Sequence, residues 1–205
     1  MSILVLTSDT LSSPAAVGQI EYSSPIFAAT PVGTQRGIVP TQQYYRLNAD
    51  LVGTQATTAQ SLFGVGCTLS ASTVYEFEMN IAFTKSAGTT AHTFGFGFAG
   101  TATLNNIVYI ATGLACQPNA SNGTAYGSYA ATASNTNTNA STSGAALTWP
   151  FIIKGTVSVN AGGTFIPQYT LSAAPGGAYS TVAGSFIRIA PIGASGSATN
   201  VGTWA

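Results

Sequence analysis

The chain has 205 residues, and charged side chains make up 5% of it, against about 25% in an ordinary soluble domain. The formal net charge is zero, and no basic patch of the kind that binds phosphate backbones is present, which excludes a nucleic-acid-binding protein. Hydrophobic residues reach 45% and aromatic residues 10%, enough for a packed core, which argues against a disordered chain.

Because so few charged side chains give little protection against protein–protein association, we expect much of the surface to contact other protein. The N-terminus, MSILVLTSDT, lacks the basic segment of a signal peptide. No apolar run approaches the ~18 residues of a membrane span, so we expect no membrane partner. The length suits one domain with an arm.

Helical periodicity is almost absent, whereas short strand patterns separated by Gly, Pro, Ser and Asn recur along the chain. Many short strands of this kind predict an all-β protein built as a sandwich or barrel. In chain order we expect strands at Ile3–Thr7, Gln19–Tyr22, Ile26–Thr30, Gly37–Val39, Gln43–Asn48, Thr58–Phe63, Val74–Thr84, His92–Ala99, Asn106–Thr112, Trp149–Val159, Thr164–Ser172 and Gly184–Pro191.

Two regions differ in composition from the rest. Residues 1–41 are rich in proline with short strand patterns, so we expect an extended N-terminal arm or hairpin module ahead of a β-sandwich domain at 42–205. Residues 120–146, ASNGTAYGSYAATASNTNTNASTSGAA, are low in complexity. We expect a long surface loop there, with a ribbon around Tyr126–Tyr129 that offers either a recognition surface or a plain solvated loop.

The alternation of apolar and polar residues indicates which face of several strands is buried. In YEFEMNIAF, 75–83, every second residue is apolar, which is typical of a strand with one buried side. The same reasoning predicts one core between two sheets, formed by Phe77, Met79, Ile81, Phe83, Phe151, Ile153, Phe165, Tyr169 and Leu171.

The segment from Thr164 onward raises two expectations about topology. Pro167 cannot donate to a sheet ladder, so we expect its strand to be an edge strand or bulged. The Ala-Pro-Gly-Gly sequence at 174–177 predicts a turn with Gly176 at positive φ, which would join this strand to 184–191 as a loose hairpin.

Glu76 and Glu78 share the polar side of the strand at 75–83, and paired carboxylates invite comparison with an inverting glycosidase. Side chains on one strand face point in parallel, however, whereas such an enzyme places its acids across a cleft. We therefore expect both glutamates to be structural, paired with Arg36, Arg46, Arg188 or a lysine, within the chain or across a subunit interface.

No other pattern predicts catalysis or a cofactor. His92 is the only histidine, and neither HExxH, CxxC nor GxSxG occurs, so we expect no catalytic, metal or cofactor site. Cys67 and Cys116 lie far apart in the sequence and are expected to be buried free thiols.

Two segments resemble structural proteins of tailed-bacteriophage virions. GQIEYSSPIFAATPVGTQRGIVP, 18–40, resembles a module in which a Gly-x-Leu/Ile-Glu-Tyr hairpin precedes Phe-x-Ala-Thr-Pro and Arg-Gly-Val/Ile-Val-Pro. AGGTFIPQYTLSAAPGGAYSTVAGSFIRIAPIG, 161–193, resembles the closing strands of the same proteins. The family usually has Asp-Gly after Glu-Tyr, where this chain has Ser23-Ser24-Pro25.

The resemblance implies a capsid decoration (cement) or head-fibre-like protein with a jelly-roll sandwich that forms a homotrimer. It implies the major capsid protein as partner and the capsid exterior as location, after synthesis in the host cytoplasm. The alternative is a tail-fibre or receptor-binding module that recognises host glycan or protein through 120–146. Strand-like sequence begins within three residues of Met1, which favours decoration over a fibre with a stalk.

The resemblance and the patterns above give a set of candidate partner-contact residues. These are Glu21, Tyr22, Phe27, Arg36, Glu76, Glu78, Tyr126 and Tyr129.

Overall fold

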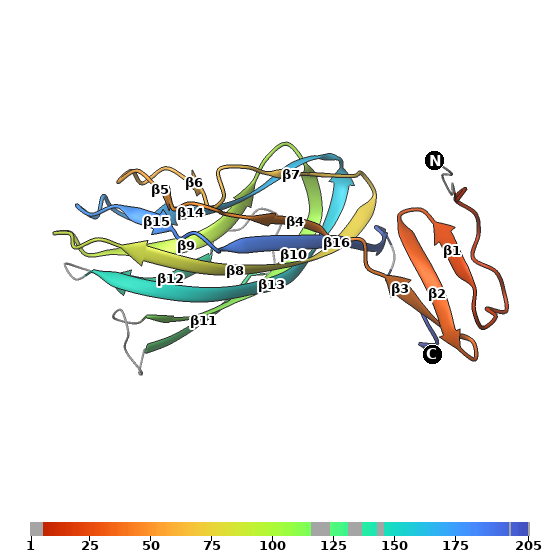
Figure 1. The fold of residues 1–205 in the computed structure, drawn as a ribbon. Helices are drawn as coiled ribbons and strands as arrows, with labels where there is room; N and C mark the ends of the chain where they lie inside the picture. Colours follow the sequence, from red (N-terminus) through yellow and green to blue (C-terminus); the bar gives the residue numbers. More distant parts are fainter. Residues whose placement is uncertain (1–5, 116–123, 131–136, 143–145, 197, 205) are drawn as a thin grey trace.

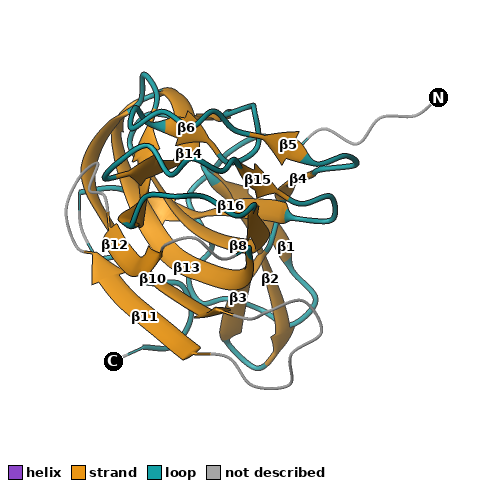
Figure 2. Cartoon of the chain, turned by 90° about the vertical axis from the view of Figure 1, so that its left-hand side faces the viewer, coloured by secondary structure: helices purple, strands orange, loops and turns teal. Residues whose placement is uncertain are grey.

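The computed structural model describes residues 6–115, 124–130, 137–142, 146–196 and 198–204. These residues form an all-β protein, and no helix occurs among them (Figure 2). Antiparallel pairing joins all the neighbouring strands, and two of the sheets make a sandwich around one hydrophobic core. The all-β antiparallel sandwich expected from the sequence is therefore confirmed.

The strands fall into three sheets. The three-stranded N-terminal sheet contains β1 (Ile20–Ser23), β2 (Ile26–Val32) and β3 (Gln35–Val39). The eight-stranded sheet contains β4 (Gln43–Arg46), β5 (Leu51–Val52), β8 (Thr73–Lys85), β10 (Thr103–Ala115), β11 (Thr124–Ala130), β13 (Leu147–Ala161), β15 (Tyr179–Thr181) and β16 (Phe186–Ala194). The third sheet contains β6 (Gln60–Ser61), β7 (Cys67–Leu69), β9 (His92–Ala99), β12 (Asn137–Thr142) and β14 (Gly163–Leu171).

The N-terminal sheet lies at one end of the sandwich, and the C-terminus ends beside β3 (Figure 1). Its first hairpin closes through Ser24 and Pro25, because Ser23 pairs with Ile26. Within 1–41 the structure thus describes a three-stranded sheet at 20–39. A strand was also expected at Ile3–Thr7. Its first three residues lie outside the described residues, and Leu6 and Thr7 are not in a strand.

The core lies between the inner faces of the two large sheets. All nine residues predicted to form it are buried in a single cluster: Phe77, Met79, Ile81, Phe83, Phe151, Ile153, Phe165, Tyr169 and Leu171. Aromatic contacts connect the layers, as where the Phe77 ring lies 5.2 Å from Phe98 and 5.9 Å from Phe165. The alternation in β8 therefore sets the register that points Glu76 and Glu78 away from the core.

The expectation of an edge or bulged strand at Pro167 is wrong. β14 pairs with β9 on one side and with β7 and β6 on the other, without a bulge at Pro167. The ladder with β7 ends at Phe165 and the ladder with β6 begins at Gln168. The Pro167 carbonyl accepts from the amide of Leu62 on this side, so the missing N–H of proline falls between two short partner strands.

The turn at 174–177 is present, but the hairpin is not. Gly176 has the expected positive φ of 76°. The strands before and after the turn lie in different sheets, because β14 pairs with β9 whereas β16 pairs with β8 and β4. The turn therefore carries the chain from one layer of the sandwich to the other, since both strands bury one apolar face in the same core.

The expectation of a long loop at 120–146 is wrong for the part of it that the structure describes as strand. β11 pairs with β10 and β12 pairs with β9, so this low-complexity segment extends both sheets. A polar segment can do this because the backbone ladder satisfies its N–H and C=O groups whatever the side chains are. The ribbon expected around Tyr126–Tyr129 falls within β11.

Candidate functional site

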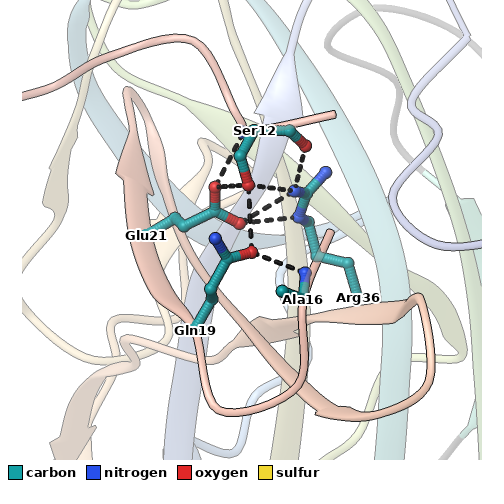
Figure 3. A network of polar contacts seen from close by, with 5 residues as sticks. All are labelled: Ser12, Ala16, Gln19, Glu21 and Arg36. Atoms are coloured by element: carbon teal, nitrogen blue, oxygen red, sulfur yellow. Dashed lines mark hydrogen bonds and ion pairs between the residues drawn. The ribbon is translucent and has the colours of Figure 1, made fainter. Parts of the chain in front are cut away.

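Glu21 and Arg36 lie on the two outer strands of the N-terminal sheet and meet over its middle strand (Figure 3). Arg36 Nε donates to Glu21 Oε2 at 2.9 Å, and the guanidinium also donates to the Ser12 carbonyl at 2.6 Å. The other carboxylate oxygen of Glu21 accepts from the Ser12 amide at 2.8 Å and from its hydroxyl at 2.7 Å. Gln19 Oε1 accepts from the Ala16 amide and lies 3.0 Å from the Ser12 hydroxyl oxygen, whose one hydrogen goes to Glu21.

This network is called the Ser12 latch below, and it contains Ser12, Gln19, Glu21 and Arg36. Hydrogen bonds from the Ser12 amide and hydroxyl, then the charge of Arg36, hold the pKa of Glu21 below its ordinary value. Glu21 is therefore ionised at neutral pH and holds the segment before β1 against the sheet. The side chains of Glu21 and Arg36 are each 15% exposed. Both were predicted to contact a partner, but in the latch they bind groups of their own chain.

The opposite side of the same sheet is more exposed and carries no charge. The register places Tyr22 beside Phe27 and Phe27 beside Val39. The rings of Tyr22 and Phe27 stack with centroids 4.6 Å apart, and the Ile20 side chain is 68% exposed. This surface is called the open face, and it consists of Ile20, Tyr22, Phe27, Ala29, Gly37 and Val39.

The second group of predicted residues lies on the outer side of the eight-stranded sheet. Glu78 on β8 accepts from Arg188 on β16 at 2.9 Å and from Lys154 on β13 at 3.1 Å. The hydrogen bond from Arg188 is the largest cause that lowers the pKa of Glu78. Burial opposes it, and Lys154 adds a further, smaller lowering of the pKa. The expected pairing of this strand face with Arg188 and a lysine is confirmed for Glu78.

Glu76 lies one step along β8 on the same side, over a hollow of about 430 Å³ that Glu78, Lys154 and Arg188 also line. It makes no hydrogen bond or ion pair within the described part of the chain, but its charge helps to raise the pKa of Arg188. The other two arginines offered as partners are engaged elsewhere. Arg36 binds Glu21, and Arg46 donates to Asn48.

Tyr126 and Tyr129 lie in β11, opposite Gly113 and Ile110 of β10. Their side chains lie outside what the structure describes, so the recognition surface predicted for 120–146 stays a prediction. The candidate contact residues are thus not one site. They are split between the N-terminal sheet, the outer side of the eight-stranded sheet and β11.

Sequence reasoning missed Ser12 and the exposed apolar residues of β10. Nothing near Ser12 in the sequence indicates that it binds Glu21, because the contact depends on how the preceding segment folds back. The apolar run Ile107–Ile110 did contain a signal. A strand buries only one face, so such a run must expose half of its side chains unless both faces are covered. Ile107 and Tyr109 are buried, whereas Val108 and Ile110 are exposed.

His92 has the structural role expected of it. It is 3% exposed, with Nδ1 2.8 Å from the Thr90 carbonyl and Nε2 2.7 Å from the Tyr179 hydroxyl. Because a carbonyl only accepts, Nδ1 carries the hydrogen in the neutral ring, and Nε2 then accepts from Tyr179. Cys67 is a half-buried free thiol whose pKa is raised by burial, and Cys116 lies outside the described residues.

Within the described ranges, no three His, Cys, Asp or Glu side chains gather closely enough to hold a metal ion. The same ranges contain no helix of the length and hydropathy needed to cross a membrane. In comparisons with known proteins, no protein-family model, curated protein or solved structure matches the chain.

Proposed function

We propose that this protein is a structural protein of a phage virion, which decorates the capsid exterior and stabilises it by binding across neighbouring capsid subunits. In this proposal the N-terminal sheet contacts the major capsid protein, and the sandwich is the folded body displayed outside the shell. The function is binding rather than catalysis, and it needs no cofactor.

The observation that carries the proposal is the two-sided character of the N-terminal sheet. One side is closed by the Ser12 latch, whereas the open face is uncharged and exposes Ile20 and Val39 beside the Tyr22–Phe27 stack. Exposed aliphatic side chains beside half-buried aromatic rings on an uncharged surface are typical of a protein contact. The latch supports this role because a sheet ordered beforehand loses less entropy on binding.

The position of the sheet also supports a contact role. It lies beyond one end of the sandwich, so it could touch a surface without displacing the core strands (Figure 1). Glu78 supports the non-catalytic part of the proposal, because Arg188 and Lys154 hold its carboxylate in ion pairs. The jelly-roll topology, the homotrimer and synthesis in the host cytoplasm come from the resemblance of 18–40 and 161–193 to virion proteins.

A matched pair of variants tests the contact surface. Ile20→Lys places a charge on the open face, so it should abolish binding to capsids that lack this protein, because the buried charge would have no partner. Val52→Lys is the control, since Val52 is 65% exposed, close to the 68% of Ile20, but lies in β5 on the sandwich. Deletion of residues 1–41 should also remove binding while circular dichroism still shows β-structure.

Co-sedimentation with purified particles measures both effects. Equal binding by Ile20→Lys and Val52→Lys, or full binding after the deletion, would contradict the proposal. The number of copies per virion separates it from the alternative of a tail-fibre or receptor-binding module. Hundreds of copies support capsid decoration, whereas a few to a few dozen would assign the protein to the tail and overturn the proposal.

A further inference from the structure

A ladder of ion pairs crosses the outer side of the eight-stranded sheet. The register places Arg188 of β16 opposite Glu78 of β8, Glu78 opposite Lys154 of β13, and Lys154 opposite Ile110 of β10. Side chains directly opposite each other on neighbouring strands share a face, so these four form one row. The row is charged at β16 and becomes apolar at β10.

The neighbouring rows continue the same change from charged to apolar. Glu76 lies opposite Thr156, and Thr156 lies opposite Val108. On the other side of the ladder, Ile152 lies between Asn80 and Thr112. The surface is called the ladder face below, and its defining residues are Glu76, Glu78, Val108, Ile110, Ile152, Lys154 and Arg188.

Two charged side chains of the ladder face, Glu76 and Lys154, have limited contacts with the described residues. Glu76 makes no ion pair or hydrogen bond with any described residue, and the Lys154 side chain is 64% exposed although it reaches Glu78. The two side chains are diagonal neighbours, because Lys154 is opposite Glu78, the next residue on this side of β8. Glu76, which acts on Arg188 only through its charge and makes no hydrogen bond or ion pair with the described residues, therefore lies beside a base that is mostly solvated.

The exposed apolar residues of the ladder face are unusual for a sheet surface that faces solvent. Ile110 is 54% exposed, Ile152 45% and Val108 37%, and they occupy adjoining positions on two paired strands. Single exposed aliphatic residues are common on proteins, but a contiguous group beside charged residues is typical of an interaction surface. Apolar area supplies the driving force of such contacts, and the charges fix their register.

We propose that the ladder face packs against the same face of other copies of this chain around a symmetry axis. In this contact Glu76 of one copy pairs with Lys154 of the partner subunit, and the aliphatic residues of β10 and β13 are buried. The charge balance favours a second copy as occupant, because the surface carries two acids and two bases in its two charged rows. A balanced surface of this kind is complementary to itself, whereas a strongly acidic or basic partner would find no matching excess.

Sedimentation velocity of the full chain without particles tests the contact. Glu76→Lys and Lys154→Glu should each raise the dissociation constant of the assembly about tenfold or more, because each places like charges together across the interface. The double variant E76K/K154E restores opposite charges in reversed order, so it should recover most of the association. Ile110→Lys should weaken association without rescue. Thr68→Lys, at the exposed position of β7, is the control that should leave association unchanged.

A monomeric wild-type chain overturns the proposal, and so does unchanged association of all the variants on the ladder face. Failure of E76K/K154E to recover what the single variants lose overturns the Glu76–Lys154 contact itself. Circular dichroism on each variant identifies any that fail to fold, and Ile110→Lys then still decides whether the face is buried. The inference is independent of capsid binding, because solution association is measured without capsids.

Discussion

Arg36 on β3 reaches Glu21 on β1 across the middle strand of the N-terminal sheet, and their side chains form an ion pair of 2.9 Å. On the middle strand, Ala28 lies opposite Glu21 on one side and Ile38 on the other, and it is fully buried. The latch thus depends on residues that are distant in sequence and become neighbours through the order of three strands.

The latch should open in acid. Because the folded-state pKa of Glu21 is lowered, its stabilisation is complete above the ordinary glutamate pKa of ~4.3 and is lost as the pH falls through the folded value. Hydrogen exchange at the Ser12 amide should therefore be slow at neutral pH, and the protection should be lost only as the pH falls below the ordinary glutamate pKa and through the lower folded-state pKa of Glu21. Glu21→Gln is the control, and an unchanged acid transition in that variant would contradict the assignment to Glu21.

Phe77→Ala should destabilise the sandwich by about 3–5 kcal/mol, because it leaves a cavity where the ring contacts Phe98 and Phe165. Urea unfolding measures the loss. Asn80→Ala changes an exposed residue of the same strand and should stay within about 0.5 kcal/mol of wild type. A small effect at Phe77 would mean that the inner face of β8 is not packed as described.

Tyr179→Phe should cost about 1–3 kcal/mol, because it leaves Nε2 of buried His92 without its hydrogen-bond donor. Thermal or urea unfolding at neutral pH gives the change in free energy. Tyr169→Phe is a matched control that removes a hydroxyl bonded to Gln60 at 3.0 Å. Gln60 is only half-buried and can bind water instead, so Tyr169→Phe should lower the free energy of unfolding by less than Tyr179→Phe. An equal decrease in both variants would argue against the importance of the His92 contact.

Changing both Glu76 and Glu78 to Gln should leave any cleavage of host glycan by purified particles unaltered. Glu78 is held by Arg188 and Lys154, and both glutamates lie on the same side of one strand. Release of reducing sugar ends from isolated host-surface glycan is the measurement. Loss of a measured hydrolytic activity in the double variant would restore the carboxylate pair as catalysts.

Much of the sandwich follows from local pattern. Strict alternation in β8 determined that Phe77, Met79, Ile81 and Phe83 are buried and that Glu76 and Glu78 are not, because successive side chains of a strand point to opposite faces. The turn at Gly176 was predictable for a similar local reason, since glycine readily adopts positive φ.

The sequence by itself therefore determined the all-β class, the core residues and the outward position of the two glutamates. Only the tertiary structure decided which strands pair, which is why β14 and β16 lie in different layers and why the low-complexity segments β11 and β12 join the sheets. It also decided that Arg188 and Lys154 meet at Glu78 and that Ser12 closes over Glu21. Alternation fixes which way a side chain points, but strand order fixes its neighbours, and that order depends on long-range pairing that no local pattern encodes.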